Sequence, residues 1–197
     1  DILTELSGDQ QARIPMITAV ATGSLVTRQF LPPEFADNYI FRVSANDSLQ
    51  AQVIVDEAVT RRGLQRLAIF HDATNYGVLG SEDLTTALHQ RGLAAVIIER
   101  FQLRETDMRA QLERARAAGA QAVLTYGIGP ELAHIANSMA HLGWQVPMIG
   151  SWTLAMSSFI ELAGRNAEGA RMPQTFIAEA RTPAQAAVDV SHSRLRP

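Results

Sequence analysis

The sequence contains no cysteine. Disulfide bonds, thiol catalysis and zinc–thiolate sites are therefore excluded, while the redox compartment stays open. No apolar run approaches the ~20 residues that a membrane-spanning helix needs. The 17 basic residues are all arginines and form no run long enough to follow a phosphate backbone, and the formal net charge is -3. We therefore expect no nucleic-acid partner.

The second feature is a regular alternation of short apolar segments and amphipathic segments, which starts near residue 48. Strands are predicted at residues 67–70, 94–98, 122–124 and 147–149. The helical period between them is punctuated by glycines, which predict helix ends at Gly63, Gly92, Gly119 and Gly143. Apolar strands separated by amphipathic helices are typical of an α/β fold, a doubly wound parallel sheet covered on both faces.

The ends of the chain have a different pattern. Strands are predicted at residues 14–19 and 39–43, with a loop of small residues at 20–24 and a crossing between lobes at 44–47. Residues 1–3 read as the middle of a helix. After residue 176 the pattern gives way to a linker at 179–183 and a polar-faced helix at 184–190. We expect the chain to be a piece of a longer protein.

Candidate site residues follow from the predicted sheet, since open parallel sheets bind ligands outside the carboxyl ends of their strands. These ends lead into loops at residues 71–76, 99–100, 126–129 and 150–152. The loops hold no convincing nucleophile–base pair: Ser151 lacks a nucleophile elbow, and His71 and Asp72 are sequence neighbours that point apart. We therefore expect no catalytic residue, no metal site, no cofactor and no enzyme activity.

Trp152 is the most informative residue of these loops. It follows a predicted strand, beside Gly150 and Ser151. By position alone it either packs in the core or faces a cleft, where an indole wall suits a planar or apolar ligand.

Several segments together carry a resemblance, in order, from about residue 10 to residue 176: "IPMITAVATGSLVT", "YIFRVSANDSLQAQ", "LAIFHDATNYGVLG", "TDMRAQLERARAAGAQAVLTYGIGPELAHIANSMAHLGW" and "FIELAGRNAEGA". They resemble the branched-chain amino-acid-binding family of type I periplasmic solute-binding proteins, which serve ABC importers. The resemblance implies two Rossmann-like lobes around a ligand cleft. Residues 1–46 would be the C-terminal part of the N-terminal lobe with the first hinge crossing, 47–171 the second lobe, and 172–197 the second crossing and the return to the first lobe.

The resemblance also implies the ligand contacts. The loop around Thr22 matches the stretch that receives a ligand carboxylate through backbone N–H and hydroxyl groups, Asp47 matches a hinge carboxylate, and Tyr76 matches a tyrosine that closes over the ligand. Ile128 and Gly129 fall where amino-acid binders often place an aromatic residue. The full set of implied ligand-binding residues is Ala19, Ala21, Thr22, Asp47, Tyr76, Ile128, Gly129 and Trp152.

Trp152 departs from the family pattern, because amino-acid binders place there a glutamate that neutralises the ligand's ammonium. A buried, unpaired ammonium costs several kcal/mol. An indole offers in return only a cation–π contact of ~0.5–2 kcal/mol. The expected ligand is therefore a small organic carboxylate, in the first place an aromatic or aliphatic acid without an amine, with an amino-acid-like solute left open.

The resemblance implies capture without catalysis. The lobes close on the solute in the periplasm, and the membrane permease of an ABC importer recognises the closed form. Two alternatives stay open at this point. The same fold serves as the ligand-sensing domain of receptors and transcription regulators, and a flavodoxin-like or nucleotide-binding enzyme is a third interpretation.

Overall fold

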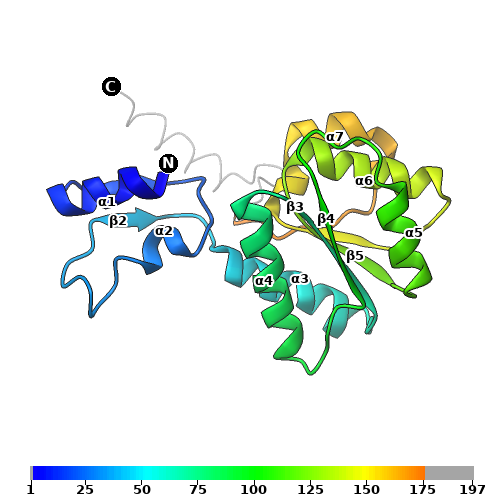
Figure 1. The fold of residues 1–197 in the computed structure, drawn as a ribbon, viewed down its shortest axis with the longest axis horizontal. Coiled ribbons are helices and arrows are strands. Elements are labelled where there is room, and N and C mark those ends of the chain that lie inside the picture. The colour runs from blue at the N-terminus through cyan, green and yellow to red at the C-terminus, as the bar shows by residue number, and fades with distance from the viewer. Residues whose placement is uncertain (1, 176–197) are drawn as a thin grey trace, which may run out of the picture.

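The structure is a computed structural model that describes residues 2–175 (Figure 1). A small N-terminal part is followed by a larger α/β part. The small part contains α1 (Ile2–Ala12), β1 (Met16–Thr18), α2 (Leu25–Arg28) and β2 (Ile40–Arg42). The larger part, called the lobe below, contains α3 (Asp47–Val55), a π-helical turn (Asp56–Arg61), β3 (Leu67–Asp72), α4 (Asn75–His89), β4 (Ile97–Phe101), α5 (Arg109–Ala117), β5 (Ala122–Tyr126), α6 (Gly129–His141), β6 (Met148–Gly150), α7 (Ser157–Ala163) and two short 3-10 turns, Trp152–Ala155 and Gly164–Ala167.

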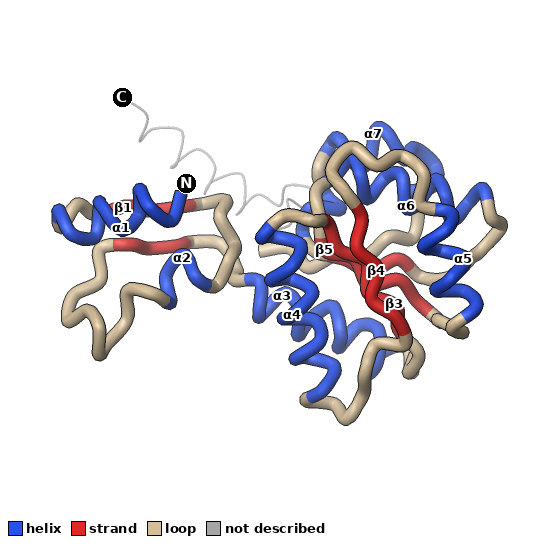
Figure 2. Tube along the Cα trace, viewed as in Figure 1, coloured by secondary structure: helices blue, strands red, loops and turns tan. Residues whose placement is uncertain are grey.

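The lobe is built on a four-stranded sheet with the order β4-β3-β5-β6, in which every pairing is parallel. α3 and α4 cover one face, and α5, α6 and α7 cover the other (Figures 1 and 2). This arrangement confirms the expected doubly wound α/β fold.

Helices cover both faces of the sheet, so the central strand β3 contributes side chains to two hydrophobic cores. Leu67 and Ile69 pack with the residues of α3 and α4, while Ala68 and Phe70 pack with those of α5, α6 and α7. Strand side chains alternate between faces, so a strand covered on both sides reads as continuously apolar. The continuous apolar run that predicts β3 in the sequence therefore reflects burial on both faces of the sheet.

The predicted helix ends are confirmed by the backbone. Gly63, Gly92, Gly119 and Gly143 have φ values of 67°, 70°, 72° and 59°. This left-handed conformation is costly for residues with a Cβ, so glycine is favoured where the helix stops.

All four strands of the sheet end later than the sequence predicts: β5 reaches Tyr126 and β6 reaches Gly150, and the differences in β3 and β4 change the expected loops. β3 continues through His71 to Asp72 and α4 begins at Asn75, so the expected polar loop is much shorter. β4 covers Ile97–Phe101 rather than residues 94–98, which places Glu99 inside a strand instead of a loop. The edge position explains the second error: Ile98 is 48% exposed while Glu99 is 8% exposed and bonds Arg114 at 2.7 Å, so polarity misidentifies the strand.

In the small part, β1 and β2 pair in parallel, with Met16 opposite Ile40. α1 and α2 cover one face of this sheet through a small apolar core around Leu6, Val26 and Phe30. The other face carries Ile17 and Phe41, which are 67% and 47% exposed. The predicted linker at 179–183 and helix at 184–190 lie outside the described residues. Over residues 2–175, no helix combines the length and apolarity needed to cross a membrane.

Candidate functional site

The candidate site lies at the topological switch point of the lobe's sheet. From β3 the chain moves outward to β4 and then returns to the other side of β3 to form β5, so the connections leave the carboxyl ends of β3 and β5 in opposite directions. His71 and Tyr126 are opposite each other at these ends. A crevice outside the strands is expected at this point.

A cavity of about 620 Å³, here called the cleft cavity, opens between this rim and residues 20–26 of the small part. It is lined from the lobe by the first turns of α4 and by the segments after β5 and β6. Of the sequence-predicted residues, the structure brings six together around the cleft cavity: Ala21, Thr22, Asp47, Tyr76, Ile128 and Trp152.

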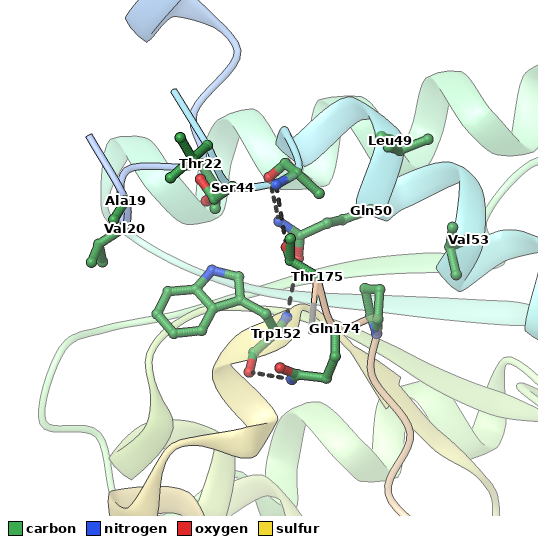
Figure 3. Close-up of a pocket in the computed structure, with 13 residues that line it drawn as sticks. Ala19, Val20, Thr22, Ser44, Leu49, Gln50, Val53, Trp152, Gln174 and Thr175 are labelled. Atoms are coloured by element: carbon green, nitrogen blue, oxygen red, sulfur yellow. Dashed lines mark hydrogen bonds between the residues drawn. The ribbon is translucent and has the colours of Figure 1, made fainter. Parts of the chain in front are cut away.

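A second cavity of about 480 Å³, here called the side cavity, lies between residues 43–45, residues 173–175 and α3 (Figure 3). Ala19, the seventh predicted residue, lines this cavity. Gly129, the eighth, lines neither of the two cavities. It is the first residue of α6, and a Cβ there would overlap the hydroxyl of Ser158.

Trp152 is half-buried and lines both cavities, so its indole is not sealed in the core. Its backbone is held from two sides: its N–H donates to Gln50 Oε1 at 3.1 Å, and its carbonyl accepts from Gln174 Nε2 at 3.4 Å. Among the described residues the buried indole Nε1 has no hydrogen-bond partner. Figure 3 shows this nitrogen on the side of the ring that faces Thr22 and Ser44. An acceptor atom of a ligand could satisfy it.

Asp47 connects the small part to the lobe. It is the first residue of α3 and only 2% exposed. Its backbone N–H donates to the carbonyl of Thr22 at 3.0 Å, and its Oδ1 accepts from Tyr126 Oη at 2.8 Å and from Gln50 Nε2 at 3.3 Å. Burial raises the pKa of Asp47, and hydrogen bonds from the hydroxyls of Thr22 and Tyr126 oppose that rise.

Tyr76 lies in the first turn of α4, with its ring centroid 5.1 Å from that of Tyr126 and the planes tilted by 55°. Burial raises the pKa of Tyr76 above its ordinary value, so the side chain stays a neutral phenol at physiological pH. Gly80 makes this packing possible, because a Cβ there would overlap the ring of Tyr126. Tyr76 therefore lines the cleft cavity, and the fully buried ring of Tyr126 supports it.

The loop at residues 19–24 is ordered by bonds that the sequence did not reveal. The N–H of Ala21, expected to face a ligand, donates instead to Thr18 Oγ1 at 3.2 Å. Arg42 Nη1 donates to the carbonyls of Thr22 and Gly23 at 3.3 and 2.8 Å. The Arg42 guanidinium therefore holds the loop in place through these two carbonyls and brings a positive charge near the cleft.

Sequence reasoning missed Gln50 and Arg42, and it placed Tyr126 in the candidate loop 126–129 without assigning it a role. One signal was available for Gln50: it lies three residues after Asp47 in a predicted helix, and such positions share a face. No local signal indicated the bond between Tyr126 and Asp47, because these residues are 79 positions apart.

The side chains of His71 and Asp72 have different partners, as expected of sequence neighbours that point apart. His71 Nδ1 lies 2.8 Å from the backbone carbonyl of Asp72 and not from its carboxylate, which accepts from the backbone N–H of Thr74 at 2.9 Å. Within residues 2–175, no cluster of three or more histidine or acidic side chains is placed to hold a metal ion.

Comparison with known proteins gives a family match over most of the chain. A family model described as periplasmic binding protein matches residues 9–190. One similar protein is the Leu/Ile/Val-binding protein homolog 3 of Brucella melitensis, 25% identical over 154 residues, which are 78% of this chain and 40% of that protein. Another is an amino acid binding protein of Pseudomonas aeruginosa, 31% identical over 134 residues, 68% of this chain and 34% of that protein.

Solved structures agree on the fold. A leucine binding protein of Thermotoga maritima superposes with a TM-score of 0.79 at 23% identity, over 98% of this chain and 54% of that one. A branched-chain amino acid ABC transporter protein of Thermus thermophilus, solved with bound valine, gives 0.79 at 24% identity, over 99% and 50%. The chain therefore spans about half the length of these solved structures, and less of the two curated relatives.

Proposed function

This chain belongs to the periplasmic binding protein family, and we propose that it captures a small organic solute in the cleft cavity without changing it chemically. The cleft supports this proposal through its composition, which combines apolar walls, two aromatic side chains and a few hydroxyl groups. The names of the relatives, which describe binding proteins, point the same way.

The proposal divides the chain into parts of two lobes. Residues up to 46 are part of the first lobe with a first hinge crossing, 47–171 are the second lobe, and the second crossing begins at residue 172. Closure on the solute brings Thr22 toward Tyr76 and Trp152, and the closed form is delivered to an ABC importer outside the cytoplasm.

The ligand class follows from the charges in the cleft. Among the described residues, Asp47 is the one acidic or basic side chain that lines either cavity. Its Oδ1 already accepts two hydrogen bonds, from Tyr126 and Gln50. We therefore infer an amine-free carboxylate, with an apolar or aromatic body against Trp152. The carboxylate lies near Thr22, on the loop that Arg42 holds.

A branched-chain amino acid is the second candidate, because the relatives are named as binders of leucine, isoleucine and valine and one was solved with valine. In that case Asp47 must supply the counter-charge for the ammonium, since Trp152 cannot. The two candidates therefore assign opposite importance to the carboxylate of Asp47.

Calorimetric titration distinguishes them. The chain is titrated with phenylacetate, 4-methyl-2-oxopentanoate, leucine and valine, and the Asp47→Asn variant is titrated in parallel. Trp144→Phe serves as the control, because Trp144 lies in the lobe's core and lines neither cavity. We expect both amine-free acids to bind more tightly than leucine and to keep their affinity in Asp47→Asn.

Tight leucine binding that is lost in Asp47→Asn would replace the first candidate by the second. If none of the four compounds binds to the wild-type chain or to the control variant, capture of a small carboxylate in this cleft is refuted.

A further inference from the structure

The geometry points to Trp152 as the residue that limits ligand length, because its indole is a partition between the cleft cavity and the side cavity. This inference rests on the proposed function and extends it from ligand class to ligand size. Neither cavity alone requires the partition; it follows from their shared walls.

The two cavities meet at three residues. Val20, Thr22 and Trp152 line both of them, while the remaining lining residues belong to one or the other. Val20 and Thr22 come from the loop of the small part, and Trp152 faces them from the lobe (Figure 3). Trp152 has the largest side chain of the three, so its indole accounts for most of the material between the cavities.

Within residues 2–175, the hydrogen bonds of Trp152 involve its backbone and not its indole, so the side chain can be replaced without breaking them. Gln50 and Gln174 bond the backbone of Trp152, and among the described residues no hydrogen bond holds its Nε1. Replacement of the side chain therefore removes the partition without removing the bonds that fix the backbone.

The side cavity is suited to an apolar extension of a ligand. Leu49 and Val53 project from α3 into it and are 56% and 45% exposed, and Pro173 lines it from the other segment. No charged side chain lines it among the described residues. A hydrocarbon tail that passed Trp152 would bury apolar surface there without removing water from a charged side chain.

A homologous series measures this limit. Each newly buried methylene strengthens binding about fourfold. Calorimetry of the chain with phenylalkanoates from phenylacetate to 8-phenyloctanoate should therefore give an affinity that rises with chain length and then reaches a plateau, where the tail meets Trp152. In Trp152→Ala the rise should continue beyond the wild-type plateau.

Two further variants keep the test decisive. Trp152→Leu retains apolar bulk, in case the alanine variant fails to fold, and should move the plateau to an intermediate length. Leu49→Trp, added to either variant, refills the side cavity and should restore a plateau near the wild-type length. Circular dichroism confirms that each variant is folded.

The outcomes separate this inference from the function beneath it. A wild-type chain that binds no member of the series refutes the proposed function, and the inference falls with it. A wild-type chain that binds the series without a plateau, or folded Trp152 variants that keep the wild-type plateau, refute the length limit and leave solute capture standing.

Discussion

Removal of the Tyr126 hydroxyl tests the bond that ties the end of β5 to the start of α3. Tyr126 is fully buried, and its hydroxyl donates to Asp47 Oδ1 at 2.8 Å. Tyr126→Phe keeps the ring and its packing against Tyr76, so the lost hydrogen bond is the main change. A hydrogen bond to a charged group contributes about 1.5–3 kcal/mol, and a buried carboxylate left short of a donor costs a similar amount.

We therefore expect Tyr126→Phe to lower the free energy of unfolding by about 1.5–3 kcal/mol. For a chain of this length that corresponds to a decrease in Tm of roughly 3–12 °C. Urea unfolding followed by circular dichroism measures it. Tyr39→Phe, a change to a half-buried tyrosine in the small part, is the control for loss of a hydroxyl elsewhere.

A double-mutant cycle with Asp47→Ala decides whether the effect belongs to this pair. Without Asp47 the Tyr126 hydroxyl has lost its acceptor, so Tyr126→Phe should then be neutral or stabilising. A cost below about 0.5 kcal/mol in the wild type, or the same cost in both backgrounds, would refute the reasoning.

Two further predictions concern the same rim. Gly77→Ala should lower the free energy of unfolding by about 1–3 kcal/mol, because a Cβ there would lie 2.7 Å from the backbone N of Asp72. Gly8→Ala is the control: a Cβ there has nothing within 4 Å, so this variant should be as stable as the wild type or more stable in thermal melts. Equal effects of the two substitutions would contradict this prediction. Burial raises the pKa of Asp47 above the ordinary value of 3.8, so the folded chain binds this proton more tightly than the unfolded chain. The free energy of unfolding of the wild type relative to Asp47→Asn should therefore be greatest below pH 3.8 and fall as the pH rises through the raised pKa. Urea unfolding of both proteins from pH 3 to 7 measures this difference, and a difference that does not change with pH would exclude the prediction.

The sequence predicted the elements whose signals are local. The alternation of apolar strands and helices ended by glycine identified a doubly wound sheet, since both signals arise within a few residues of chain. β4 was misplaced because it lies at the edge of the sheet: Glu99 is buried there by its bond to Arg114, a residue 15 positions away. Polarity alone cannot reveal such a pairing.

The candidate site was predictable to the extent that topology decides it. The carboxyl ends of β3 and β5 and the turn after β6 identified Tyr76, Ile128 and Trp152, which do line the cleft cavity. The internal bonds of the site were not predictable. Ala21 donates within its own loop to Thr18, three residues earlier, and Asp47 accepts from Tyr126, 79 residues along the chain, so neither bond shows in the sequence pattern.

The most direct test of the central claim uses Trp152 itself as a reporter of the cleft. The chain has two tryptophans, so Trp144→Phe leaves Trp152 as the single fluorophore. The account predicts that phenylacetate changes the emission of Trp152 saturably, with the Kd that calorimetry gives for the same variant. Calorimetric binding with an unchanged Trp152 emission would contradict it, because the ligand would then occupy another place.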